Sequence, residues 1–380
     1  MKHILKTNLS LICTILLLHA CKIVKPIVYN LPDEKDVKLF PYRTIQPSQT
    51  GVFHFKKATQ FSAEIKNIRL ENKALNSTDV PLDEFVKLHK TISFLIIRND
   101  SILYESYAEN YSEKSNVTSF SIAKAYVTML TGIAVKEGFI KSIDEPVTNY
   151  IHEWNTKPDY QRITIKDLLR HTSGLKFTDS YMNPKSDQFQ FYYGTELRKL
   201  ILGCGIKEKP GLHFEYQSEN SSLLGLILER ATGKTLSAYL EEKIWKKIGT
   251  EAPALWSTDR TDSLAIEKAF CCLNARTIDF AKFGRLLLHN GTWDGQQIIP
   301  AAWIKEATRK TNENGEKITY GYNMGLGPAL YNSFYPIGLY GQWLYVYPKK
   351  NILIVRFGNA DIAYNPSYWK DIMLQLVDQL

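Results

Sequence analysis

The chain has 380 residues, of which 44% are hydrophobic and 23% are charged. A chain of this length and composition can bury one large core or two smaller ones, which excludes disorder for most of it. The 21 glycines, the 15 prolines and the lack of a short repeat exclude collagen, coiled coils and solenoids. The formal net charge of +8 comes from basic residues scattered along the sequence, so we expect no nucleic-acid partner.

The first twenty residues have the layout of a secretory signal peptide. Lys2 and Lys6 precede an apolar run, Leu9 to Leu18, that is shorter than the roughly 18 residues needed to span a bilayer. Ala20 stands directly before Cys21, which resembles the lipobox of bacterial lipoproteins. The resemblance implies export to a bacterial cell envelope, on the periplasmic or surface side, with a membrane anchor through a lipid on Cys21. A signal peptide without lipidation is the alternative.

Three cysteines follow Cys21, namely Cys204, Cys271 and Cys272. An odd number cannot all pair, and a bridge between neighbours strains the peptide that joins them. The one disulfide to consider therefore joins Cys204 to one member of the adjacent pair. Because that pair has no second pair or histidine cluster near it, we expect no zinc or other metal site.

The hydrophobic pattern divides the exported chain in two. Residues 21–83 are polar and lack a sustained period, so we predict a tether and an N-terminal leader before a domain over 84–380. Ile92–Arg98 and Ile102–Tyr107 are β-rich runs separated by three turn residues, which predicts an antiparallel hairpin. Ser121–Glu137 then predicts an apolar helix that is closed by Gly138.

The middle of the chain alternates helical stretches with Pro- and Gly-marked turns. Helices are expected over 165–170, 221–230, 236–248 and 277–289. Beyond Gly321 the β pattern returns in Gln342–Tyr347 and Asn351–Phe357, before an amphipathic helix over Pro366–Leu380. This order predicts an α+β fold in which both chain ends build one antiparallel sheet and a mostly helical lobe is inserted, with a cleft between them.

Ser121 and Lys124 form an S-x-x-K motif at the start of a predicted helix. Their spacing puts both side chains on one helix face about one turn apart, so the amine can take the serine proton. The helix N-terminus favours a developing negative charge at the same place. Such spacings also arise by chance, so the motif alone leaves a solvated serine and lysine as the alternative.

In its context the motif resembles that of the serine β-lactamase and penicillin-binding-protein superfamily. The matching stretches are Phe120–Lys124, Gly132–Gly138 and Leu168–Leu175, the last of which holds an H-T-S-G-L run that is structural in the family. The likeness covers roughly residues 90 to 360. It implies a β-lactamase/transpeptidase-like fold and a serine hydrolase that needs neither a metal nor an organic cofactor.

The family's second motif, Tyr-x-Asn, has its counterpart in Tyr216-Gln217-Ser218. The resemblance gives Tyr216 the role of passing a proton to the leaving group, next to the ammonium of Lys124. Ser218 stands where many members have asparagine, which counts against a typical class C β-lactamase. The Y-x-S form, together with Trp293–Pro300, looks closest to the branch of 6-aminohexanoate-dimer hydrolases and esterases.

The third motif, Lys-Thr-Gly or His-x-Gly, has its counterpart in Leu339-Tyr340-Gly341-Gln342. Gly341 allows a close approach of the backbone, and the Gln342 amide is the expected second oxyanion donor beside that of Ser121. Tyr340 completes the predicted substrate-binding set with Ser218. Since no cation occupies the first position, we expect neutral or amine-bearing amides and esters before cell-wall peptides or β-lactams.

The pattern thus predicts acyl transfer on a small amide, ester or peptide, with Ser121 as nucleophile, Lys124 as base and Tyr216 as acid. The alternatives are a β-lactamase or D-alanyl-D-alanine carboxypeptidase, and a lipoprotein that keeps the penicillin-recognising fold as a binding module. A Ser-His-Asp hydrolase would need a G-x-S-x-G elbow, and neither Gly132 nor Gly174 lies in one.

Overall fold

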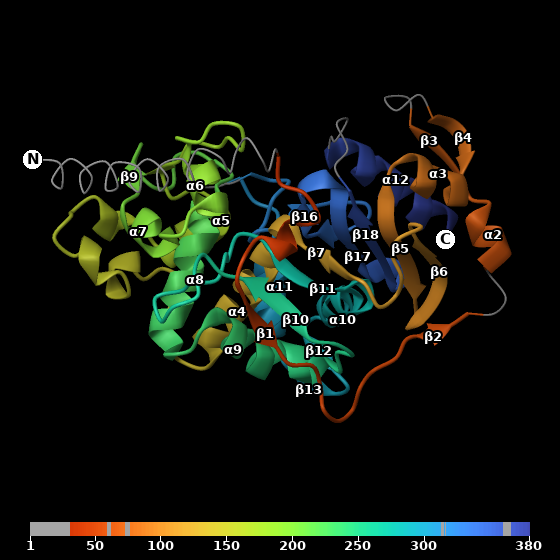
Figure 1. The fold of residues 1–380 in the computed structure, drawn as a ribbon, viewed down its shortest axis with the longest axis horizontal. Coiled ribbons are helices and arrows are strands. Elements are labelled where there is room, and N and C mark those ends of the chain that lie inside the picture. Colours follow the sequence, from red (N-terminus) through yellow and green to blue (C-terminus); the bar gives the residue numbers. More distant parts are fainter. Residues whose placement is uncertain (1–30, 59–61, 73–76, 313–314, 316, 360–365) are drawn as a thin grey trace, which may run out of the picture.

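The structure, a computed structural model, describes residues 31–58, 62–72, 77–312, 315, 317–359 and 366–380. The predicted signal peptide and Cys21 lie outside these residues. None of the helices in the described segments has both the length and the hydrophobicity needed to cross a membrane. The described chain forms a large sheet with helices on both faces and a helical lobe beside it (Figure 1).

The large sheet takes its strands from both ends of the described chain. Its order is β14-β15-β17-β18-β5-β6-β2, with β16 paired to β17. The β2–β6 pair is parallel, and the other pairs of this sheet in the described segments are antiparallel. The strands are β2 (Lys56–Lys57), β5 (Thr91–Arg98), β6 (Ser101–Tyr107), β14 (Gly325–Leu326), β15 (Phe334–Tyr335), β16 (Ile337–Gly338), β17 (Gln342–Tyr347) and β18 (Ile352–Gly358).

Two predicted hairpins form the centre of this sheet. Asn99 and Asp100 make the β5–β6 turn with φ of 50° and 58°, the left-handed pair whose twist matches that of the flanking strands. A turn over Pro348–Lys350 joins β17 to β18. β18 pairs with β5 along its length, with Ile354 opposite Ile96, and Figure 1 shows the two strands side by side in colours from opposite ends of the chain. The predicted antiparallel sheet is confirmed.

Alternating burial explains why helices cover both faces of the sheet. In β18, Leu353 and Val355 join the core that contains α4 and α10, whereas Ile352 and Ile354 join the core that contains α3 and α12. A strand that is covered on both faces carries apolar side chains on both faces, and β18 does so. The covering helices are α3 (Leu82–Leu88), α4 (Ala123–Lys136), α10 (Thr277–Leu288) and α12 (Pro366–Gln379).

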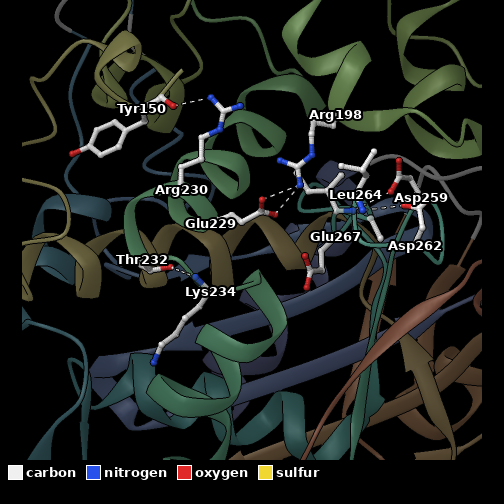
Figure 2. Close-up of polar contacts among 12 residues, drawn as sticks. Tyr150, Arg198, Glu229, Arg230, Thr232, Lys234, Asp259, Asp262, Leu264 and Glu267 are labelled. Atoms are coloured by element: carbon white, nitrogen blue, oxygen red, sulfur yellow. Dashed lines mark hydrogen bonds and ion pairs between the residues drawn. The ribbon is translucent and has the colours of Figure 1, made fainter. Parts of the chain in front are cut away.

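The inserted lobe is mostly helical, as predicted. Figure 2 shows contacts that hold it: Arg198 donates to both carboxylate oxygens of Glu229, and Arg230 donates to the carbonyl of Tyr150. The helix predicted over 236–248 is α9 followed by a π-helical and a 3-10 turn. The elements are α5 (Ile165–Arg170), α6 (Asp187–Tyr193), α7 (Leu197–Leu202), α8 (Ser218–Thr232), α9 (Leu236–Leu240), β8 (Leu175–Lys176) and β9 (Gly205–Ile206), and α11 (Ala301–Ala307) follows later in the chain.

A second sheet, of order β1-β10-β11-β7, includes part of the predicted leader. Ile45 of β1 is fully buried, and the carboxylate of Asp36 accepts a hydrogen bond of 2.8 Å from the Tyr192 hydroxyl. The described part of residues 21–83 is therefore packed onto the domain. The remaining elements are β1 (Tyr42–Ile45), β7 (Asn116–Thr118), β10 (Ala254–Ser257), β11 (Leu273–Arg276), the hairpins β3–β4 (Arg69–Asn72, Ser77–Pro81) and β12–β13 (Thr292–Trp293, Gln296–Gln297), and α2 (Ser62–Lys66).

Helix α8 buries an acid in its first turn. Glu219 has no exposed surface, and within the described segments neither oxygen of its carboxyl group has a hydrogen-bond partner. Burial, with a smaller contribution from Asp187, raises the pKa of Glu219 well above its usual value. An unpaired carboxylate would be very costly at this position, so the carboxyl group is neutral in the folded protein.

We expect Glu219→Gln to stabilise the protein at alkaline pH. The unfolded chain releases this proton near pH 4.5, whereas the folded chain keeps it. The contribution of Glu219 to the free energy of unfolding is thus complete below pH 4.5 and is lost as pH rises, by up to about 1.4 kcal/mol per pH unit. Because glutamine does not ionise, urea unfolding should show a gain for the variant at about pH 8 and none near pH 4.5. An equal difference at both pH values would contradict a neutral Glu219.

Candidate active site

Ser121 lies in a short 3-10 turn, Phe120–Ile122, that leads directly into α4. Phe120 has a φ of 40°, a strained conformation that costs about 1–3 kcal/mol and clusters at functional sites. Ser119, just before the turn, is bonded twice to Leu273: its N–H donates to the Leu273 carbonyl (2.8 Å) and its Oγ accepts from the Leu273 N–H (3.2 Å). These bonds to β11 hold the backbone that presents Ser121.

Lys124 lies one helical turn after Ser121, and only 1% of its surface is exposed. Its Nζ donates to Ser121 Oγ at 2.9 Å and to the carbonyl oxygen of Phe270 at 2.8 Å. Phe270 belongs to the segment that leads into β11. The structure therefore brings the S-x-x-K pair together and holds the amine between the hydroxyl group and a backbone carbonyl.

Tyr216 packs against the same amine, with Lys124 Nζ 4.9 Å from its ring centroid. The ring also contacts the imidazole of His171, at a centroid distance of 4.8 Å and an angle of 31°, and the ring of Tyr320 at 6.0 Å. Tyr216 is 37% exposed. Its ring is thus held between neighbours while part of the side chain remains open to a substrate.

His171 supports Tyr216 as a neutral imidazole. Its Nδ1 accepts from the backbone N–H of Gln217 (3.2 Å) and from the side-chain amide of Asn220 (3.1 Å). The proton therefore lies on Nε2, which donates to Asn323 Oδ1 at 2.8 Å. Burial is the main reason why the pKa of His171 falls to about 3. The contacts agree with the structural role that the family resemblance gives the H-T-S-G-L run.

Ser218, the other residue of the second motif, begins α8 and is 5% exposed. Its carbonyl accepts a hydrogen bond of 3.0 Å from Ser222 Oγ, one turn along the helix. The chain therefore places Ser218 beside Tyr216, at a helix start.

The third motif, Leu339–Gln342, begins beside the turn that carries Ser121. A side chain on Gly338, in β16, would come within 2.6 Å of the Ser119 carbonyl oxygen, so glycine allows this approach. The ring of Tyr340 meets the ring of Phe120 edge to face, with 5.6 Å between centroids. The first and third motifs, far apart in the sequence, are therefore neighbours in space.

Arg356, which is fully buried, orients the backbone of the third motif. Its Nη1 donates to the carbonyls of Tyr340 (2.9 Å) and Gly341 (2.7 Å). Since C=O and N–H of a trans peptide point in opposite directions, the second bond turns the Gln342 N–H away from Arg356. The Gln342 side chain forms two hydrogen bonds with the Gly358 backbone, of 2.8 and 2.6 Å. The backbone of Gln342 pairs with Gly338 in the β16–β17 ladder, so its role as an oxyanion donor stays a prediction.

Several residues close to the three motifs belong to none of them. Asp179 is exposed, but partial desolvation raises its pKa, and the charge of Lys124 opposes that rise. Burial also raises the pKa of Tyr181 well above its usual value, with a smaller contribution from the negative charge of Asp179. Sequence reasoning missed both residues, although an acid between aromatic residues directly after the H-T-S-G-L run was an available signal. Phe270 was missed as well, because its contribution is a backbone carbonyl.

Cys271 and Cys272 form a disulfide bond with each other, and Cys204 is free. The pairing of Cys204 with one of them, which the sequence left open, is therefore not formed. The strain of a bond between neighbours is accommodated because Cys272 takes a left-handed φ of 68° just before β11. Cys204 follows α7, where its Sγ contacts the Leu200 carbonyl at 3.5 Å.

Known proteins resemble this chain in sequence and in fold. The Beta-lactamase family model matches residues 83–374. The 6-aminohexanoate-dimer hydrolase of Paenarthrobacter ureafaciens is 23% identical over 313 residues, which cover 77% of this chain and 78% of that enzyme.

Two solved structures share the fold. A proposed 6-aminohexanoate-dimer hydrolase from Bacillus anthracis has a TM-score of 0.79 at 23% identity, over 91% of this chain and 92% of that one. A family VIII carboxylesterase has a TM-score of 0.60 at 17% identity, over 87% and 99% of the two chains. The predicted α+β fold of β-lactamase type and the family resemblance are confirmed. Because the family model spans well over half of the chain, this protein belongs to the Beta-lactamase family of serine hydrolases.

Proposed function

We propose that this protein hydrolyses small amides or esters through a covalent acyl-enzyme on Ser121. The observation that carries the proposal is the 2.9 Å contact between Ser121 Oγ and the Nζ of Lys124, a buried amine. In its neutral form an amine at this distance can remove the hydroxyl proton. Relatives named as a 6-aminohexanoate-dimer hydrolase and a carboxylesterase support an amide or ester as substrate.

In the proposed acylation, Ser121 Oγ bonds to the substrate carbonyl carbon and its proton passes to Lys124. The N–H groups of Ser121 and Gln342 stabilise the negative charge that develops on the carbonyl oxygen. As the C–N or C–O bond breaks, Tyr216 gives its proton to the leaving group and takes one from Lys124. Water then attacks the acyl carbon, the acid leaves, and Ser121 regains its proton.

The proposal extends to location. The layout of residues 1–21 supports export and a lipid on Cys21, and the mass of the N-terminal peptide from the exported protein tests this step.

We further propose that the substrate carries an amine. Leu339 stands where the family has the cation that usually anchors a substrate carboxylate. Asp179, whose pKa is lowered by the charge of Lys124 against the effect of desolvation, is the acid that we propose as the partner of the substrate's amine. Penicillins and D-alanyl peptides carry a carboxylate of their own, which disfavours the β-lactamase and carboxypeptidase alternatives.

Ser121→Ala should abolish labelling by a fluorophosphonate probe and lower turnover of esters by at least about 10³-fold, because the nucleophile is lost. Lys124→Met should lower turnover by about 10²–10⁴-fold, because the base is lost. Peptide mapping of the labelled full chain locates the adduct. Lys136→Met, at the far end of the same helix, is the matched control and should retain labelling. No adduct on the folded wild-type protein would favour the binding-module alternative.

Tyr216→Phe should depress amide cleavage far more than cleavage of activated esters. An amine leaves only when it is protonated, whereas an activated alcohol or phenol leaves readily without a proton. The comparison is kcat/KM for an amide and an activated ester that share one acyl group. Equal losses on both substrates would argue against Tyr216 as the proton donor.

Asp179→Asn should raise KM about tenfold for an amide with a free amine and leave KM unchanged for its neutral analogue, because one charged contact is lost. Asp159→Asn, at another exposed aspartate, controls for a general loss of negative charge. The measurement is steady-state kinetics on the two substrates. An equal change for both would show that Asp179 does not recognise the amine.

A further inference from the structure

We propose that the Cys271–Cys272 disulfide is a positioning element of the catalytic centre, which holds the carbonyl that binds Lys124. This inference rests on the proposed roles of Ser121 and Lys124. Its basis is the place of the bond in the chain. Phe270, directly before the pair, accepts the 2.8 Å hydrogen bond from Lys124 Nζ.

The residue directly after the pair is tied to the nucleophile as well. Leu273 forms the two hydrogen bonds with Ser119, two residues before Ser121. β11 starts at Leu273 and pairs with β7, the strand that leads into the Ser121 turn. The disulfide therefore lies between two attachment points, of which one holds the base and the other holds the backbone of the nucleophile.

The carbonyls of the pair are anchored from the side of β10. The Cys271 carbonyl accepts from Trp256 Nε1 at 3.1 Å, and the Cys272 carbonyl accepts from the Ser257 N–H at 3.1 Å. Asn274 Nδ2 also donates to the Cys272 carbonyl, at 2.9 Å. Both cysteines are buried, at 2% and 3% exposure. A change of conformation at the pair would break these bonds and move the neighbouring peptides.

The bond is suited to local positioning and poorly suited to global stabilisation. A disulfide restrains the unfolded chain mainly through the length of the loop that it closes, and adjacent cysteines close the shortest loop available. Locally, however, Cys272 has a left-handed φ of 68°, which L-residues seldom adopt. The covalent ring holds this conformation, and with it the direction of the Phe270 carbonyl. A misplacement of about 1 Å at a catalytic group can lower a rate by about 10²-fold.

The test compares variants of the full chain that lack the bond. Cys271→Ser, Cys272→Ser and the double variant remove one and the same bond, so all three should lower kcat for an ester about tenfold or more, by similar factors, with KM changed less than twofold. Cys272→Gly accepts the left-handed φ without strain and guards against misfolding of the serine variants. Cys204→Ser, which removes the free thiol, is the matched control and should match wild type.

Two readouts are independent of catalysis. Alkylation of the unfolded wild-type protein without reductant should label Cys204 and leave Cys271 and Cys272 unlabelled. Amide hydrogen exchange of the peptide that contains Ser119 should be faster in the bond-free variants, because the contacts to Leu273 loosen.

Each outcome decides a separate question. Labelled thiols at 271 and 272, wild-type kcat in the bond-free variants, or a double variant much slower than either single variant would overturn the positioning role. The last result would mean that the side chains act through packing. If wild type shows no fluorophosphonate adduct, the proposed function fails, whereas hydrogen exchange still decides whether the bond holds the Ser119 backbone.

Discussion

The active site depends on one buried amine held by neutral oxygens. Removing an ammonium group from water costs several kcal/mol, and at Lys124 the Ser121 hydroxyl and the Phe270 carbonyl offset part of that cost. Neither oxygen carries a charge. The hydrogen bonds of Lys124 described above therefore go to uncharged groups, which suits the role of base that we propose for it.

Another buried lysine of the same chain provides the contrast. Lys282 of α10 has no exposed side-chain surface, and its ammonium contacts the carboxylates of Asp279 (3.2 Å) and Glu251 (3.0 Å). Lys282 is therefore a structural cation in a buried ion-pair cluster. Arg356, bonded to backbone carbonyls beneath the third motif, is another structural cation. The two buried lysines thus differ in their partners, which are uncharged at Lys124 and acidic at Lys282.

Local signals predicted much of this molecule. The turn residues between β5 and β6 fixed a hairpin, and the three-residue spacing of Ser121 and Lys124 placed both on one face of α4. Tyr216 and Gln342 were found only through motifs shared with a family. Arg356 and Phe270 had no signal, because each acts on a segment remote in sequence through backbone carbonyls, which every residue has. The Cys271–Cys272 bond was rejected on general strain, since the left-handed turn that permits it is not visible in cysteine spacing.

The pairing of β18 with β5 also determines when the sheet can be completed during synthesis of the chain. Ser121 and Lys124 are made early in the chain, whereas Gln342 and the Arg356 that bonds to the neighbouring carbonyl are made much later. Until then β5 lacks a neighbour on one edge, and pairings of such long sequence separation form slowly. A nascent chain therefore carries Ser121 before Gln342 is made, and the third motif is fixed on the sheet only when β18 pairs with β5.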